Sequence, residues 1–282
     1  MTMTLEQIHR PRTPGVFVTG TGTEIGKTVV SCLIADQLRR RAHADGESRR
    51  IGVMKPLATG CRRERGSLVA EDAEQLAAAA DFVTGAGEPA PLDVINPIRF
   101  VPPVAPSVAI EHAATQGESV EWLSADGNLD WSGVDRALRL LDGSCARLVI
   151  EGVGGALVPI EMDRGKPITV IDLARSIGYP CVVVADAALG TLNHTWLTIE
   201  ALRRAGLTVA GVVLNRFDAH STDLAMQTNP AWLKRLTGVP VLAAIPSAES
   251  WDASSIDPVL RNAIDQRSFW ELCRGSTGGV RR

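Results

Sequence analysis

The chain has 282 residues, of which 45% are hydrophobic and 22% are charged, and its formal net charge is -3 at pH 7. This length suits one large α/β domain or two small ones, and the net charge does not suggest broad electrostatic binding to nucleic acid or anionic membranes. No apolar run is long enough to span a bilayer, and the first residues lack the apolar core of a secretory signal.

Short apolar segments alternate with helical patterns along the chain. We predict strands at residues 15–20, 51–56, 147–152, 181–186, 209–215 and 239–246. Most of them are apolar throughout, which is typical of parallel strands buried on both faces. Helical periodicity predicts helices at residues 27–41, 71–82, 131–141, 192–205 and 223–236. The alternation predicts an α/β fold: a doubly wound, mainly parallel sheet with helices on both faces.

No repeat or long linker divides the chain, so we expect a single domain. Residues 1–14 are expected to form a flexible leader, residues 15–250 the main domain, and residues 251–282 a C-terminal helix and frayed tail of the same domain. The stretch 83–130 is rich in Pro and Gly and predicts loops around a short helix. Five scattered cysteines without a CxxC pair indicate buried free thiols in a reducing cytoplasm.

The segment GTGTEIGKT, residues 20–28, lies between the first strand and the first helix, as a phosphate-binding loop requires. A common P-loop has four residues between its first glycine and the Gly-Lys-Thr end. Gly20 lies one residue too early for that spacing, so this loop is longer. We expect Lys27 to neutralise phosphate charge and the Thr28 hydroxyl to ligate Mg²⁺.

Polar residues follow two further strands at their carboxyl ends, where ligands of such sheets bind. Lys55 is expected to be an exposed strand-end side chain that projects toward bound phosphate, and Thr59 follows it in a polar turn. Glu151 ends the third strand in the Walker-B arrangement, a carboxylate placed for Mg²⁺. Asp72 is either a second metal ligand or a first-turn residue that complements the dipole of its helix.

Two asparagines occupy positions suited to a ligand. Asn193 begins an amphipathic helix, where its side chain could cap the helix or bind a carboxylate. Asn215 ends a strand, where it could contact a nucleotide base. With Arg216 and Asp218 it forms a string similar to the guanine-reading N-K-x-D of GTP-binding proteins.

Taken together, the motifs resemble the dethiobiotin synthetase family of biotin biosynthesis, whose phosphate loop carries the same extra residue. The resemblance implies a P-loop NTPase type of fold and a cytoplasmic homodimer with the active site at the subunit interface. The segments that carry it follow the family's order over roughly residues 16–246: FVTGTGTEIGKT, MKPLATG, AEDAEQL, INPIRF, PPVAPSVA, LVIEGVGGALVPI, LGTLNHTWLTIEALRRAGL, VVLN and AAIP.

The resemblance also implies a reaction, the ATP-dependent closure of a cyclic urea on 7,8-diaminononanoate with CO₂ as the carbon source. A carbamate forms first, a carbamic-phosphoric anhydride follows, and the products are dethiobiotin, ADP and phosphate. Mg²⁺ is the implied cofactor and ATP the co-substrate, with no nucleic-acid or membrane partner.

The resemblance also implies roles for the residues that match positions of the family's motifs. Lys27 and Lys55 would stabilise phosphate and carbamate charge, and Thr59 would hydrogen-bond the carbamate. The implied metal ligands are Thr28, Asp72 and Glu151. The implied nucleotide contacts are Thr23, Glu24, Ile25, Gly26, Lys27, Thr28, Glu151, Gly152, Gly154, Gly155, Asn215, Ala244, Ile245 and Pro246. The implied substrate contacts are Thr23, Lys55 and Thr59, with Gly190, Thr191, Leu192 and Asn193 from the neighbouring subunit.

The sequence departs from the family at Ala188, where some members carry a basic residue, and the N-x-x-D string leaves the nucleotide preference open. Three alternatives remain. A partition-type switch ATPase carries a signature lysine early in its phosphate loop, and no lysine precedes Lys27 in this loop. Another P-loop amidoligase would act with a glutamine-hydrolysing domain, for which this chain has no room. The third alternative is a non-catalytic nucleotide-binding module.

Overall fold

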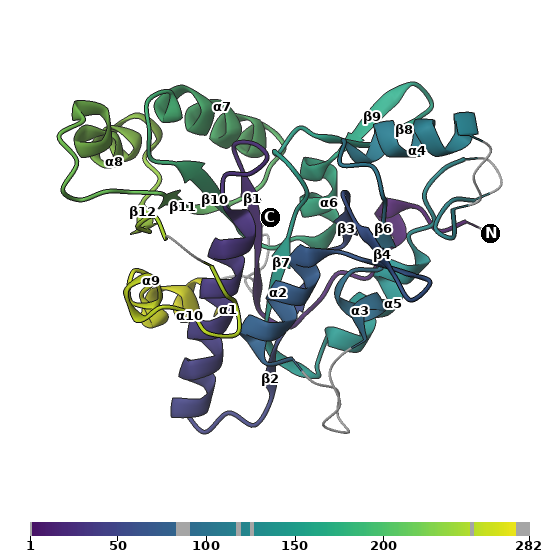
Figure 1. Cartoon of the computed structure of the whole chain (residues 1–282), viewed down its shortest axis with the longest axis horizontal. Coiled ribbons are helices and arrows are strands. Elements are labelled where there is room, and N and C mark those ends of the chain that lie inside the picture. The colour runs from purple at the N-terminus through teal and green to yellow at the C-terminus, as the bar shows by residue number, and fades with distance from the viewer. Residues whose placement is uncertain (1, 83–90, 117–119, 125–126, 249–250, 275–282) are drawn as a thin grey trace, which may run out of the picture.

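A parallel sheet forms the centre of the molecule (Figure 1). The structure is a computed structural model that describes residues 2–82, 91–116, 120–124, 127–248 and 251–274. Within these residues the sheet has six strands in the order β12-β11-β10-β1-β7-β2. Their bounds are β1 (Gly15–Gly20), β2 (Arg50–Met54), β7 (Cys145–Glu151), β10 (Cys181–Asp186), β11 (Val209–Asn215) and β12 (Val241–Ala244). The predicted doubly wound parallel sheet is confirmed.

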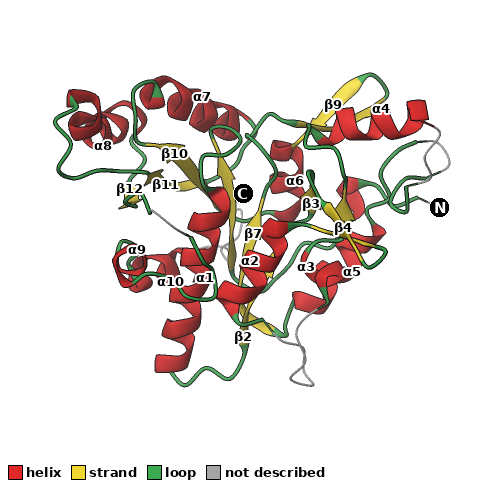
Figure 2. Cartoon of the chain, viewed as in Figure 1, coloured by secondary structure: helices red, strands yellow, loops and turns green. Residues whose placement is uncertain are grey.

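Helices cover both faces of the sheet (Figure 2). One face packs against α1 (Lys27–Ala44), α2 (Glu71–Ala80), α9 (Pro258–Asn262) and α10 (Gln266–Arg274). The other packs against α5 (Ser132–Leu141), α6 (Val170–Ile177), α7 (Thr191–Arg204) and α8 (Leu224–Thr237). Alternate residues of β1 enter the two cores: Val16 and Val18 one, Phe17 the other. This arrangement buries β1 on both faces and leaves its carboxyl end open for the phosphate loop.

Shorter strands and helices lie outside the central sheet. Small strand pairs, none of them predicted, join β3 (Leu57–Ala58) to β6 (Ile98–Arg99), β4 (Arg62–Glu64) to β5 (Ser67–Val69), and β8 (Pro159–Asp163) to β9 (Lys166–Thr169). The loop-rich stretch contains α3 (Leu92–Ile95) and α4 (Pro106–Gln116). Residues 83–90, 117–119 and 125–126 of that stretch lie outside the described residues.

The expectation of a flexible leader is wrong for residues 2–14. A short 3-10 helix, η1 (Leu5–Gln7), begins there, and Leu5 and Ile8 are buried in the core that faces α5. Three aspartates in and beside α5 accept backbone N–H groups of this segment: Asp130 from Met3, Asp135 from His9, and Asp142 from both Arg12 and Thr13. The leader is held because it covers apolar surface and its polar backbone finds acceptors.

The C-terminal segment packs as α9 and α10 against α1, and the tail beyond residue 274 lies outside the described residues. All five cysteines are free and buried, as the sequence indicates. In the part of the chain that the structure describes, no helix has both the length and the apolar character needed to cross a membrane.

Candidate active site

A cleft of about 440 Å³ opens at the carboxyl ends of β1, β2 and β7. It is built from the phosphate loop, the turn after β2, the start of α2 and the glycine loop after β7. The sequence-predicted residues that line it are Thr23, Glu24, Gly26, Lys27, Thr28, Lys55, Thr59, Asp72, Glu151 and Gly154. Pro103 and Val153 also line it and were not singled out from the sequence, because neither has a chemically distinctive side chain.

The phosphate loop ends at Gly26, which caps α1 in a left-handed conformation with φ 88. A β-carbon at residue 26 would lie 2.0 Å from Asn215 Nδ2, so only glycine fits. Lys27 is buried, and its Nζ donates to the carbonyl of Gly22 at 2.7 Å. Burial, together with repulsion from Lys55, lowers the pKa of Lys27 to about 8. The ammonium is therefore held inside the cleft, close to the loop backbone.

Lys55 is not the exposed strand-end residue that the sequence suggested. Its side chain is only 4% exposed, and Nζ donates to Glu151 Oε1 at 2.6 Å and to the carboxylate of Asp72. Burial alone would lower the pKa of Lys55, but the two carboxylates outweigh it and raise the pKa. Burial likewise opposes ionisation of Asp72, yet attraction to Lys55 brings its pKa below the usual range. The ammonium group of Lys55 thus lies between the carboxyl groups of Asp72 and Glu151.

Three oxygen atoms converge beside this cluster. Thr28 Oγ1 lies 2.9 Å from Asp72 Oδ1 and 2.9 Å from Glu151 Oε1. Glu151 Oε2 is buried without a hydrogen-bond partner among the described residues. A hydroxyl and two carboxylates fit Mg²⁺, which takes few protein ligands and completes its shell with water and phosphate. The described residues contain no cluster of three or more His, Cys, Asp and Glu of the kind that zinc favours.

Other predicted nucleotide contacts lie outside this cleft lining. Gly152 packs against Phe17 and Val170, and Gly155 packs against the backbone of the phosphate loop. Asn215 stands behind the loop, where its Nδ2 donates to the carbonyl of Ile25 at 3.0 Å. Ala244 ends β12, and Ile245 and Pro246 follow it, with Ile245 bonded through its backbone to Leu214 and Phe217.

The segment predicted to bind the substrate carboxylate is also separate from the strand-end cleft of the same subunit. Gly190 caps α7 (Thr191–Arg204), residues 191–193 begin it, and the side chain of Thr191 is buried against Thr195. Asn193 lines a different cleft, of about 870 Å³, together with Leu157, Trp196 and Leu197.

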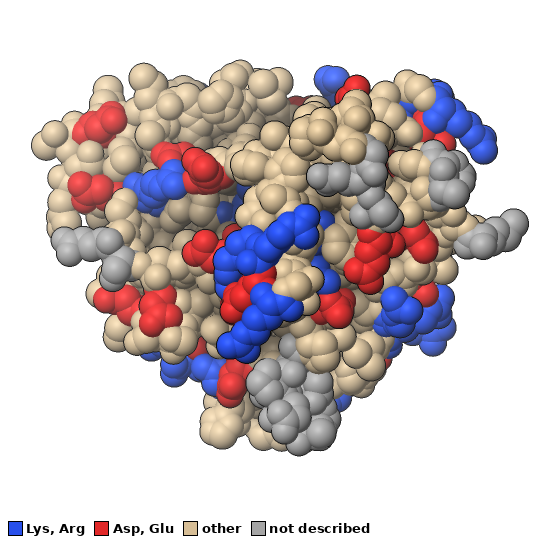
Figure 3. Space-filling view, turned by 45° about the vertical axis from the view of Figure 1, so that its right-hand side comes forward, with Lys and Arg blue, Asp and Glu red and all other residues tan. Residues whose placement is uncertain are grey.

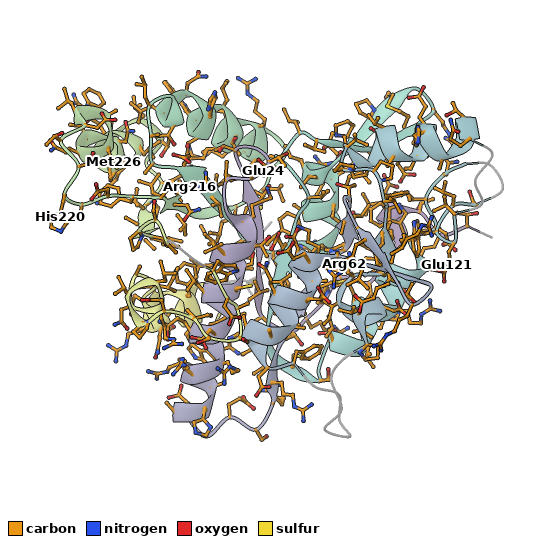
Figure 4. The ribbon with its side chains drawn as sticks, in the orientation of Figure 1. Glu24, Arg62, Glu121, Arg216, His220 and Met226 are labelled. Atoms are coloured by element: carbon orange, nitrogen blue, oxygen red, sulfur yellow. The ribbon has the colours of Figure 1, made fainter. Side chains whose placement is uncertain are left out.

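Arg216 was noted from the sequence only as part of the N-x-x-D string. Its guanidinium donates to Asp186 Oδ2 at 2.8 Å and to the carbonyl of Glu24 at 2.6 Å (Figure 4). It therefore joins the end of β11 to the end of β10 and to the phosphate loop. The one sequence feature that could have identified Arg216 as a site residue is its position directly after Asn215 at the end of a strand.

The chain resembles several known proteins. The family model described as an AAA domain, AAA_26, matches residues 14–255. The chain is 33% identical over 235 residues to the ATP-dependent dethiobiotin synthetase BioD of Thermodesulfovibrio yellowstonii, covering 82% of this chain and 88% of the relative. It is 41% identical over 232 residues to the enzyme of that name from Anaeromyxobacter sp. strain K, covering 82% and 89%. Among solved structures, the MinC:MinD cell division protein complex of Aquifex aeolicus aligns with a TM-score of 0.48 at 10% identity, covering 95% of this chain and 98% of that one.

Proposed function

The chain belongs to the family of ATP-dependent dethiobiotin synthetases, and on this premise we propose that the strand-end cleft is where it closes the cyclic urea of dethiobiotin. It is a ligase that uses ATP. The observation that carries the assignment to this cleft is the meeting of Lys27, Lys55, Thr28 and two carboxylates at the end of the phosphate loop.

The reaction proceeds in three steps. One amine of 7,8-diaminononanoate attacks CO₂ and loses a proton, which gives a carbamate. A carbamate oxygen attacks the γ-phosphorus of ATP, and the bond to ADP breaks, which leaves a carbamic-phosphoric anhydride. The second amine then attacks the carbonyl carbon and loses a proton, and the C–O bond to phosphate breaks as the ring closes and phosphate leaves. Each step develops or moves negative charge, so positioned cations are the main contribution that the protein makes.

The cleft residues suit these charges. Lys27, buried against the loop, would contact the oxygens of the β- and γ-phosphates. The protonated Lys55 would stabilise the negative charge of the carbamate and of the transferred phosphoryl group. Thr59, in the turn that follows Lys55, would donate to a carbamate oxygen. Thr23 and Glu24 line the same cleft and would contact both substrates.

Thr28, Asp72 and Glu151 would hold Mg²⁺, whose chemistry when bound is to neutralise the phosphate oxygens. The convergent oxygens and the unpartnered Glu151 Oε2 support this assignment. Lys55 then exchanges part of its contact with the carboxylates for contact with substrate. We therefore expect the ligand-free ion pairs to loosen when ATP and metal bind.

A homodimer would complete the site. Leu157, Trp196 and Leu197 are exposed by 64%, 44% and 62%, and all three line the cleft that also holds Asn193. An exposed apolar surface of this kind favours burial in an interface. We infer that a second copy covers it, so that residues 190–193 of one subunit receive the substrate carboxylate at the cleft of the other, where a helix N-terminus attracts the anion.

A cytoplasmic location and a single domain complete the proposal. Five buried free thiols suit a reducing compartment.

The two cores share one sheet, and α10 packs on α1, which supports a single folding unit that includes residues 251–274.

The direct test of the function is an assay with purified protein, 7,8-diaminononanoate, bicarbonate, Mg²⁺ and ATP. We expect dethiobiotin and phosphate to appear in equal amounts, and phosphate release to stop when the diamine is left out. Phosphate release that is indifferent to the diamine would instead indicate a switch ATPase.

A further inference from the structure

Lys55 and Thr59, the two residues proposed to contact the carbamate, lie at the two ends of a short segment that contains β3. The segment follows β2, the strand at one edge of the central sheet. The last residue of β2 that pairs with β7 is Met54, so the ladder of the central sheet ends before Lys55. Pro56 has no N–H group to donate. The central sheet alone therefore does not hold this segment in place.

The INPIRF segment, residues 95–100, runs beside the segment from Lys55 to Thr59 and bonds to its backbone. The carbonyl of Ile95 accepts the N–H of Lys55 at 2.7 Å. Between Lys55 and Thr59, β3 then pairs in parallel with β6 (Figure 1). The position of Lys55 and Thr59 thus depends on the INPIRF segment, to which the proposed function gives no role.

Asn96 adds a side-chain contact to this backbone support. Its side chain is fully buried, and Nδ2 donates to the carbonyl of Lys55 at 2.6 Å and to the carbonyl of Ile98 at 3.3 Å. Because Ile95 accepts the N–H of Lys55, two neighbouring residues bind both backbone polar groups of this lysine. These contacts restrict the direction in which the side chain of Lys55 leaves the backbone.

The orientation of the Asn96 amide leaves its oxygen unused. Within the residues that the structure describes, Asn96 Oδ1 is buried without a hydrogen-bond partner. The opposite orientation would place this oxygen against the carbonyl oxygens of Lys55 and Ile98, so these two acceptors decide which way the amide faces. A buried acceptor without a partner lowers stability. The role that fits this arrangement is placement of the Lys55 backbone.

We propose that Asn96 is a positioning residue for the reaction, which holds the backbone of Lys55 so that Lys55 and Thr59 both reach the carbamate. Asn96 is not among the described residues that line the cleft, so it acts through Lys55. The Nζ atom of Lys55 is confined between Asp72 and Glu151, and a shift of its backbone would displace it from substrate. The inference rests on the proposed function, which the turnover of the unaltered protein tests separately.

The test replaces the amide with a side chain of similar size that cannot donate, Asn96→Leu. The control is Tyr179→Phe. Tyr179 is buried, and its hydroxyl donates to the carbonyl of Thr13 beside the first residues of β10, at the opposite end of the sheet from the cleft. Each variant therefore removes a buried bond from a side chain to the backbone. Thermal unfolding, calorimetric binding of Mg²⁺–ADP, and kcat/KM for 7,8-diaminononanoate are measured for both variants and for the unaltered protein.

We expect Asn96→Leu to lower kcat/KM for the diamine on the order of 10- to 100-fold, which is the effect of a misplaced catalytic group. Its affinity for Mg²⁺–ADP should change by less than about twofold, because Asn96 makes no contact with the phosphate loop. Tyr179→Phe should lower the temperature of unfolding and keep kcat/KM. An equal loss of kcat/KM in Tyr179→Phe would overturn the proposal, since loss of any buried hydrogen bond would then suffice.

Asn96→Ser provides a second variant, which decides the question if Asn96→Leu does not fold. One hydroxyl can donate to only one of the two carbonyl groups, so kcat/KM should fall between the values for the unaltered protein and for Asn96→Leu. Unchanged kcat/KM in folded Asn96→Leu or in Asn96→Ser would overturn the proposal. A parallel loss of Mg²⁺–ADP binding would also overturn it, because Asn96 would then support the cleft in general rather than Lys55.

Discussion

At the scale of single residues, Lys55 carries the strongest electrostatic constraint in the site. It is buried between Asp72 and Glu151, and Glu151 is fully buried. A buried charge that loses its partner is costly, while the intact pair is close to neutral in its effect on stability. Lys55 therefore has two roles that must be separated by experiment, one in the reaction and one in pairing with the buried carboxyl group of Glu151.

Replacing Lys55→Met should abolish turnover and also lower the free energy of unfolding by about 3–5 kcal/mol, because the two carboxylates are left unpaired. Urea denaturation and the dethiobiotin assay measure the two effects. The double variant Lys55→Met/Glu151→Gln removes the unpaired charge as well, so we expect much of the stability to return while turnover stays absent. Full activity in the single variant would remove Lys55 from the reaction.

Gly26 offers a second residue-scale prediction. Gly26→Ala needs both a left-handed alanine and displacement of Asn215, whereas Gly46→Ala, with φ 71 and nothing within 4 Å of the added carbon, needs only the first. The control should lose about 1–2 kcal/mol of stability. Gly26→Ala should lose more and should also bind Mg²⁺–ADP far more weakly, as calorimetry would show. Equal losses in the two variants would contradict the close packing of Asn215 on the loop.

At the scale of elements, the leader is held by hydrogen bonds to ionised aspartates. Burial opposes ionisation of Asp142, but hydrogen bonds from Thr13, His9 and Arg12 outweigh it and keep its pKa below the usual range. Because the pKa of a folded-state aspartate lies below its unfolded value, its stabilising effect is present above pH about 4 and is lost as pH falls further. The leader should therefore loosen in acid.

Asp142→Ala should lower the free energy of unfolding at pH 7 by about 1–3 kcal/mol, since it leaves backbone N–H groups of the leader without an acceptor. Below pH about 4 its stability should approach that of the unaltered protein, because the lost contribution is absent there in both. Asp163→Ala is the matched control, an exposed aspartate whose pair with Arg164 spans 3.9 Å. A constant deficit across pH would show that Asp142 acts through packing alone.

Elements with a regular pattern of apolar residues could be predicted from the sequence. The six central strands were predictable because most of them are apolar throughout, and α1, α2, α5, α7 and α8 because their periodicity is helical. The helix α6 was missed although Thr169, Asp172 and Gly178 mark its two ends with a capping box and a left-handed glycine. The strand pair β4–β5 could not be predicted, since β4 is exposed and consists of charged residues.

For the candidate site, the sequence predicted which residues to consider but not the contacts between them. Motifs identified the residues of the phosphate loop and the strand ends, because each motif is local in sequence. Lys55 contacts carboxyl groups of residues 17 and 96 positions away, and the hydrogen bond from Arg216 to the carbonyl of Glu24 spans 192 positions. Contacts of this kind leave no local pattern, so only the three-dimensional structure reveals them.

At the scale of the whole molecule, charged side chains of both signs are mixed, whereas some exposed apolar side chains gather in one place. On the face shown in Figure 3, Lys and Arg side chains lie among Asp and Glu side chains, in keeping with the small net charge. The exposed apolar residues Leu157, Trp196 and Leu197, in contrast, gather at one cleft beside α7. The proposed dimer predicts that each active site combines the strand-end cleft of one subunit with the start of α7 from the other.

Mixing two damaged homodimers tests this combination. Lys55→Met damages the cleft, and Asn193→Ala damages the segment given to the partner. Random exchange of subunits makes about half of the dimers mixed, each with one intact site, so turnover should recover to about a quarter of the unaltered value. The protein with both substitutions in one chain, mixed with unaltered protein, provides the control for exchange. No recovery despite proven exchange would mean that each subunit builds its own site.

The most direct measurement of the central claim follows one oxygen atom. If a carbamate oxygen attacks the γ-phosphorus, that oxygen leaves with phosphate when the ring closes. A single turnover with ¹⁸O-labelled CO₂, ATP, Mg²⁺ and 7,8-diaminononanoate should therefore release phosphate that carries one labelled oxygen for each dethiobiotin formed. Phosphate that takes its new oxygen from water instead, with no label from CO₂, would contradict the account.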